Sequence, residues 1–226
     1  MDIEKKTNSK AYRFFDWLYK LLIMNVFTIL SIIPIITAFP AIVATYATIK
    51  NDMREPGIFK KFFANYKKYF LKSLIVGIVL LIVIAIIAFS FYFYAFGIPQ
   101  DKNNNFLEDW DILFQMGVVV MFILALVVIM IGVHLPLIII TFEELSTFET
   151  IRTSFYIAFR YIISTLILIL MFICQIIGVI ALPIWFLFGI TLPILLGIKF
   201  TNAVYYSFEQ IDLESIFKKA EDDLDE

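Results

Sequence analysis

A few polar side chains interrupt the apolar stretches of this 226-residue chain, and they are the first candidates for chemistry. If those stretches cross a membrane, polar groups within them are costly and mark functional positions by default. The candidates are Asn25, His134, Gln175, Lys199 and Asn202. Asn25 and Gln175 most simply form hydrogen bonds between helices. Lys199 either extends its ammonium group to the inner membrane surface or pairs there with Glu143 or Glu144.

Signatures of enzymes are missing from the sequence. It has no glycine-rich phosphate loop, no H-E-x-x-H motif and no G-x-S-x-G motif. Its one histidine, His134, and its one cysteine, Cys174, give too few ligands for a zinc site, which needs three or four. A net charge of −2 provides no electrostatic basis for binding nucleic acid. We therefore expect a protein that is not an enzyme, with no catalytic residues, cofactor or metal and no nucleic-acid partner.

The composition is that of a membrane protein. Apolar residues make up 62% of the chain and charged residues 17%, against roughly 45–50% and about 25% in soluble domains. Four stretches without Asp, Glu, Lys or Arg cover residues 21–49, 73–100, 112–142 and 161–198. A helix of about 20 apolar residues crosses a bilayer. We therefore expect an all-α, polytopic transmembrane helical bundle with the lipid bilayer as its main partner.

The last of these stretches is long enough for two crossings, with Pro183 at the turn between them. We therefore expect about five spans, at 21–39, 73–97, 112–135, 161–181 and 184–204. The chain then divides into a basic N-terminal tail with an aromatic interfacial segment (1–20), a transmembrane domain (21–208) and an acidic cytoplasmic tail (209–226). The apolar region after Lys20 is longer than that of a signal peptide, so we expect it to be retained.

Basic residues orient the spans, because short cytoplasmic loops are enriched in Lys and Arg. Residues 50–72 are rich in lysine and are expected inside, whereas the acidic segment 98–111 is expected outside. The N-terminal tail is basic as well, and one crossing cannot keep both of its flanks inside. Two interpretations stay open. A full crossing kinked at Pro34 places the tail outside, whereas a break at Pro34 with a re-entrant return keeps both flanks inside.

An amphipathic segment precedes the second expected span. Over residues 57–73, aromatic side chains share one helical face and lysines lie largely opposite, which is typical of a short interfacial helix. The lysines are candidate contacts for anionic lipid or a cytoplasmic partner: Lys60, Lys61, Lys67 and Lys68. Residues 39–81 also resemble residues 135–172, which indicates a two-unit internal repeat in which Pro40 and Pro136 each begin an in-plane helix. Alternatively, any two amphipathic-then-apolar segments look alike.

The run LLIMNVFTILSIIPIITAFPAIVATYATIK, followed by FFANYKKYFLKSLIVGIVLL, resembles the YesL family of bacterial membrane proteins, also called DUF624. Matching positions include Asn25, Pro34, Thr37, Pro40, Ala41 and Ala44. The resemblance implies a multi-pass protein of the bacterial plasma membrane. The family's activity is not established, but its genes often lie beside carbohydrate ABC transporters. That implies an accessory or regulatory role in carbohydrate uptake or utilisation, with such a transporter as candidate partner. The alternative is a small-solute transporter or channel.

Overall fold

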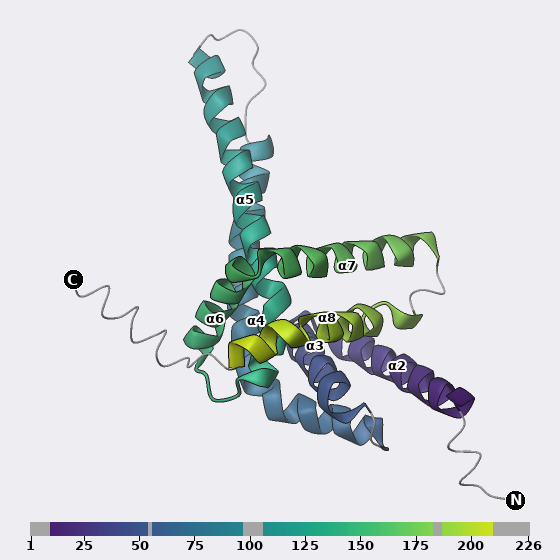
Figure 1. Cartoon of the computed structure of the whole chain (residues 1–226). Helices are drawn as coiled ribbons and strands as arrows, with labels where there is room; N and C mark the ends of the chain where they lie inside the picture. The colour runs from purple at the N-terminus through teal and green to yellow at the C-terminus, as the bar shows by residue number, and fades with distance from the viewer. Residues whose placement is uncertain (1–9, 54–55, 97–105, 183–186, 210–226) are drawn as a thin grey trace, which may run out of the picture.

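A computed structural model describes residues 10–53, 56–96, 106–182 and 187–209, and the regular elements within these ranges are helices (Figure 1). This confirms the expected all-α class. In chain order the elements are α2 (Lys10–Ile32), η1 (Ile35–Thr37), α3 (Ala38–Ala47), η2 (Thr48–Asp52), α4 (Ile58–Phe96), α5 (Phe106–Thr141), α6 (Thr147–Arg160), α7 (Ile162–Ala181) and α8 (Thr191–Glu209).

Four helices of the described residues are long and apolar enough to cross a membrane, namely α2, α4, α5 and α7. The last three agree with the second, third and fourth expected spans. The fifth expected span, 184–204, overlaps α8, whose apolar stretch Thr191–Thr201 lies in the part of the chain that the structure describes. The expected turn at Pro183 lies outside the described residues.

The first apolar helix ends at Pro34. α2 stops at Ile32, Pro34 has an extended backbone (φ −77°, ψ 103°), and the single 3₁₀ turn η1 follows. Proline lacks a backbone N–H and clashes with the preceding turn, so it ends a helix here. Thr37 closes the turn by donating its backbone N–H to the Pro34 carbonyl at 2.7 Å and its hydroxyl to the Ser31 carbonyl at 2.8 Å.

After this turn α3 returns antiparallel to α2. The hydroxyl oxygens of Thr28 and Thr45 lie 2.6 Å apart, and Lys20 Nζ donates to the Met53 carbonyl at 3.3 Å. Both pairs are centred on the η1 turn, so the two arms form a helical hairpin whose ends lie together. α2 is long and apolar enough over Tyr12–Ile32 to cross a membrane, but the chain reverses at Pro34 and α3 brings it back to the level of Lys20. This geometry agrees with the re-entrant interpretation and not with a single crossing over 21–39. We call residues 20–53 the Pro34 hairpin.

The expected amphipathic segment and the second span form one continuous helix, α4. Aromatic side chains in its first turns pack on α2, with the Phe27 ring centroid 4.9 Å from that of Phe59 and 6.0 Å from that of Phe63. Further along, Gly77 lets α3 come close, because a Cβ at this position would lie 2.7 Å from Phe39 Cβ. α4 therefore supports both arms of the Pro34 hairpin.

The expectation that Pro136 begins a new helix is wrong, since α5 continues through it to Thr141. The short amphipathic helix of this region is α6, which begins with a capping box. Ser146 Oγ accepts from the Glu149 N–H at 3.3 Å, and the Glu149 carboxylate accepts from the Ser146 N–H at 2.6 Å. Pro40 does lie in the first turn of its helix, where proline is tolerated. The internal repeat stays a prediction.

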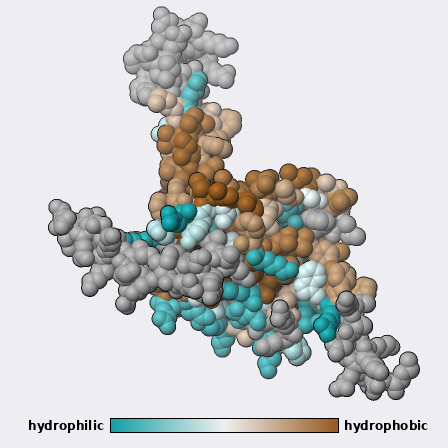
Figure 2. Space-filling view, viewed as in Figure 1, coloured by the Kyte–Doolittle hydropathy of each residue, from teal (hydrophilic) through white to brown (hydrophobic). Residues whose placement is uncertain are grey.

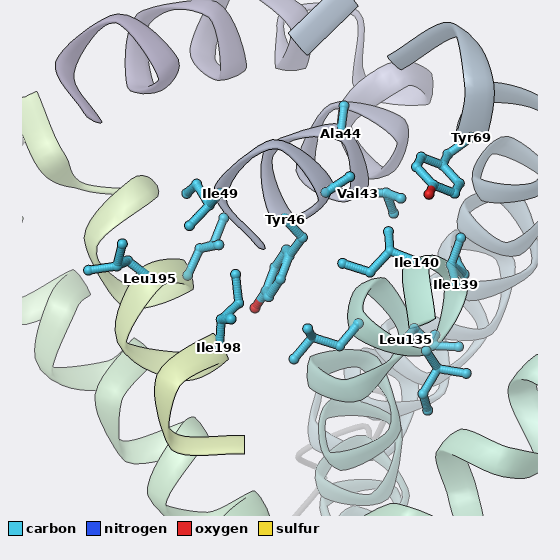
Figure 3. Close-up of a cluster of buried hydrophobic side chains, with 14 of the residues drawn as sticks. Val43, Ala44, Tyr46, Ile49, Tyr69, Leu135, Ile139, Ile140, Leu195 and Ile198 are labelled. Atoms are coloured by element: carbon cyan, nitrogen blue, oxygen red, sulfur yellow. The ribbon is translucent and has the colours of Figure 1, made fainter. Parts of the chain in front are cut away.

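The α4–α5 hairpin projects away from the other helices (Figure 1). Only 11% and 6% of the residues in the apolar windows of α4 and α5 are buried, and Figure 2 shows hydrophobic atoms along this projection and hydrophilic atoms near its base. The buried core lies at that base. In Figure 3, Tyr46 of α3 points between α8, which contributes Ile198, and α5, which contributes Leu135 and Ile139.

Candidate functional site

Glu143 connects the loop after α5 to the first half of α4. Its Oε1 accepts from Lys68 Nζ at 2.6 Å and from the Tyr69 hydroxyl at 2.5 Å. One turn further on, Lys72 Nζ donates to the backbone carbonyls of Phe142 and Glu143 at 3.3 and 3.2 Å. Neighbouring turns of α4 therefore fix the position of the loop that leads into α6.

The alternative in which Lys199 pairs with Glu143 or Glu144 is not formed among the described residues. The Glu143 carboxylate takes Lys68 as its partner, and Lys199 instead lines a pocket at the start of α2. Lys68 is thus part of an internal contact, whereas Lys60 and Lys67 are exposed on α4. The sequence contains many lysines within residues 50–72, and nothing in their spacing indicates which of them faces the α5–α6 loop.

We expect the contribution of Glu143 to stability to depend on pH. Hydrogen bonds from Lys68 and Tyr69 hold the pKa of its carboxyl below the ordinary value of 4.5. A lowered pKa stabilises the folded state at pH values above about 4.5, and this stabilisation disappears as the pH falls below it. Because both side chains of the ion pair are about half exposed, the effect is only about 0.2–1 kcal/mol.

The test is the midpoint of thermal unfolding in detergent, measured from pH 7 to pH 3.5 for wild type, Glu143→Gln and the control Glu144→Gln. Glu143→Gln is expected to lie below wild type at pH 7 and to converge with it at the acidic end. A difference that stays constant over this range would contradict the assignment of Glu143.

Asn25 joins the Pro34 hairpin to the start of α8. Its buried Oδ1 accepts from the Ile190 N–H at 3.0 Å, and beside it Thr191 Oγ1 donates to the Leu21 carbonyl at 3.3 Å. The first N–H groups of a helix have no partner within that helix. Asn25 therefore supplies an acceptor that the apolar surroundings lack.

His134 packs at the break between α6 and α7. It is fully buried, and its Nε2 lies 2.9 Å from Thr165 Oγ1, which donates to the Ala158 carbonyl at 3.0 Å. Because the Thr165 hydroxyl donates its one proton to that carbonyl, its oxygen accepts from the imidazole Nε2–H of His134. This bridge satisfies a carbonyl beside the break. Within the described ranges no three His, Cys, Asp or Glu side chains gather as metal ligands.

Gln175 lies buried on α7, and its side-chain Nε2 has no hydrogen-bond partner among the described residues. The hydrogen bond between helices expected for it is therefore missing from this part of the structure. The side chain of Asn202 lies outside the described residues. Sequence reasoning overlooked Thr45, since a threonine hydroxyl in a helix normally bonds its own backbone and gives no signal of a contact between helices.

Because a buried donor without a partner destabilises a fold, we expect Gln175→Leu to raise the free energy of unfolding by about 1–3 kcal/mol. The measurement is the thermal midpoint of purified protein in detergent. Cys174→Ala, at the exposed neighbouring position, is the control and should match wild type. A lower midpoint for Gln175→Leu would show that the amide has a partner in the folded protein.

Comparison with known proteins finds a family model that matches part of the chain. A model of the family DUF624, described as a protein of unknown function, matches residues 18–91. This stretch covers most of α2, the turn at Pro34, α3 and most of α4. No curated protein and no solved structure matches the chain.

Proposed function

We propose that this chain, which belongs to the DUF624 family through residues 18–91, is an accessory or regulatory protein of the bacterial plasma membrane and not itself a transporter. The observation that carries this proposal is the exposure of α4 and α5. Few residues in the apolar stretches of α4 and α5 are buried within the chain. Neither residues 73–96 of α4 nor residues 114–141 of α5 include a charged side chain. Such surfaces suit contact with lipid and with helices of another membrane protein.

A transporter of small solutes needs a polar binding site near the middle of the membrane, between helices that pack around it. The hollows described here lie elsewhere. They are lined by residues of the first half of α2, of the loop before α4 and of the loop after α5, such as Lys20, Gly57 and Glu143. The polar groups within the apolar helices are few, and Asn25 and His134 are occupied by hydrogen bonds within the chain. This arrangement favours the accessory role over transport by the chain alone.

The proposed link to carbohydrate uptake rests on the resemblance to DUF624, whose genes often lie beside carbohydrate ABC transporters. We propose such a transporter as the partner. The exposed α4–α5 hairpin is free to lie along its transmembrane helices, and the polar base is free to contact its cytoplasmic parts.

Two measurements test the function. First, the tagged full-length chain is purified from membranes of its own cell, and the partner is identified by mass spectrometry; co-purification of a carbohydrate ABC transporter is expected. Second, the purified chain is reconstituted into proteoliposomes with labelled sugars and ions, and no flux is expected. Flux that is lost in Asn25→Leu or Gln175→Leu would instead establish the small-solute transporter. Unchanged sugar uptake in a deletion strain, on every sugar tested, would contradict the carbohydrate link.

A further inference from the structure

The helix α6 buries its small, hydroxyl-rich face and exposes its aromatic one. The side chains buried within the protein are Thr150, Thr153, Ser154, Ile157 and Ala158. The opposite face carries Phe148, Phe155 and Phe159, which are 74%, 49% and 43% exposed. A surface helix of a protein in water has the reverse arrangement, with its apolar stripe toward the core. The outer face of α6 therefore calls for apolar surroundings.

Contacts on the inner face hold α6 in this orientation. α6 packs on α5, and Ile157 is fully buried in the core. Two of the buried hydroxyls are satisfied within the helix, because Thr150 Oγ1 donates to the Ser146 carbonyl at 2.8 Å and Ser154 Oγ donates to the Thr150 carbonyl at 2.9 Å. The hydroxyl-rich face thus belongs to the fold, and α6 cannot turn its phenylalanines inward without breaking these contacts.

The exposed phenylalanines form a stripe that leads toward a membrane-spanning helix. They recur at intervals of seven and four residues, which places them on one side of α6, and the ring centroids of Phe155 and Phe159 lie 4.6 Å apart. Four residues after Phe159, the exposed Ile163 begins the apolar surface of α7. α7 is long and apolar enough to cross a membrane. The stripe therefore continues along the chain into a surface that suits lipid.

The charged residues of α6 determine how deep it can lie in a membrane. Its fourteen residues include Glu149, Arg152 and Arg160. Charged side chains are costly in the hydrocarbon core, so α6 does not fit there. A helix with one apolar face and several charges fits instead in the interface, where headgroups meet acyl chains.

A break at Tyr161 lets the chain change direction between α6 and α7. The backbone of Tyr161 (φ −114°, ψ 49°) leaves the helical region, and Figure 1 shows α6 and α7 running in different directions. The Ala158 carbonyl beside the break accepts from the Thr165 hydroxyl at 3.0 Å, so it is not left without a donor. This geometry allows α6 to follow the membrane surface while α7 enters the bilayer.

We propose that the outer face of α6 is anchored in the membrane interface, with the lipid bilayer as its partner. Phe148, Phe155 and Phe159 insert between the headgroups and the first part of the acyl chains. The apolar face of such a helix lies about 5–10 Å deep in this boundary. The proposal concerns the chain by itself in a bilayer, so it does not depend on the accessory role and either one can fail alone.

Spin labels on single cysteines measure this depth. The full-length chain carries a Cys174→Ser substitution and is placed in nanodiscs of phosphatidylcholine and phosphatidylglycerol. The labelled variants are Phe148→Cys, Phe155→Cys and Phe159→Cys. Collision rates with oxygen, which concentrates among acyl chains, and with a water-soluble nickel chelate report the depth of each label. The references are Glu144→Cys, exposed in the loop before α6, and Phe122→Cys, exposed within α5.

The three labels on α6 are expected at a depth of about 5–10 Å, between position 144 in water and position 122 in the hydrocarbon core. Collisions mainly with the nickel chelate at all three positions would show that this face lies in water. Low rates with both reagents would show that protein covers it, either another segment of this chain or a second copy. A depth equal to that of position 122 would place α6 in the core. Each of these three results overturns the proposal.

Removing phenylalanines then tests whether they hold α6 at this depth. With the label kept at position 148, the double variant Phe155→Ser, Phe159→Ser is expected to shift that label toward water, because most of the apolar stripe is lost. The control is Phe89→Ser, at a strongly exposed phenylalanine of α4, which should leave the label in place. Retained circular dichroism with a monodisperse elution profile shows that each variant is folded. An unchanged depth in the double variant, or an equal shift in Phe89→Ser, overturns the assignment.

Discussion

Replacing Gly77 with alanine is expected to destabilise the protein, whereas the same change at Gly132 is expected to leave it unchanged or slightly more stable. Both glycines lie inside long helices. A Cβ on Gly77 would lie 2.7 Å from Phe39 Cβ, an atom next to the backbone of α3 that cannot turn away. A Cβ added to Gly132 would lie 4.0 Å from a methyl carbon of Leu80, an ordinary van der Waals contact.

The expected changes in the free energy of unfolding have opposite signs for the two variants. Overpacking at Gly77 costs about 1–3 kcal/mol, and it forces apart the contact between α3 and α4. At Gly132 the helix propensity of alanine contributes up to about 1 kcal/mol in favour of folding. The midpoint of unfolding in detergent is measured for both variants. Equal midpoints would show that α3 does not pack closely on α4 at Gly77.

Asn25→Leu is expected to release the start of α8 from the Pro34 hairpin. Leucine has a similar volume but removes the acceptor for the buried Ile190 N–H. A buried donor left without a partner costs about 1–3 kcal/mol. We expect a lower unfolding midpoint and faster proteolysis at the start of α8, the latter because the hydrogen bond between Thr191 and Leu21 is the remaining polar anchor described there.

Thr201→Val is the matched control for this variant. The Thr201 hydroxyl is also buried, but it donates at 2.7 Å to the Gly197 carbonyl within its own helix, so its loss should change the midpoint little. If Asn25→Leu and Thr201→Val give the same small change, Asn25 is not the anchor of α8.

The class of protein could be predicted from the sequence because long charge-free stretches have few structural alternatives. The behaviour of Pro34 could not. A proline within an apolar helix is compatible with a kink or with a reversal. The choice depends on contacts between distant residues, here Thr28 with Thr45 and Lys20 with Met53. Neither contact leaves a periodic pattern in the sequence.

Pro136 shows the opposite difficulty. The sequence predicts that Pro136 begins a helix. In the structure α5 continues through it, because proline removes only one hydrogen bond of a helix whose other turns remain intact. The stronger signal lies further on, where Ser146 and Glu149 have the spacing of a capping box. The partner of Glu143 was beyond prediction for a different reason, since several lysines of α4 carry the same charge and only the packed structure distinguishes Lys68.

Accessibility in intact cells tests most directly whether the first apolar segment returns to the side on which it began. Single cysteines are placed at Ser9, at Ala64 and, as an external control, at Asn103, in a Cys174→Ser background, and labelled with an impermeant thiol reagent. With the Pro34 hairpin re-entrant, position 103 reacts in intact cells, whereas positions 9 and 64 react only after permeabilisation. Labelling at position 9 in intact cells, with position 64 still protected, would show a full crossing and contradict the hairpin topology.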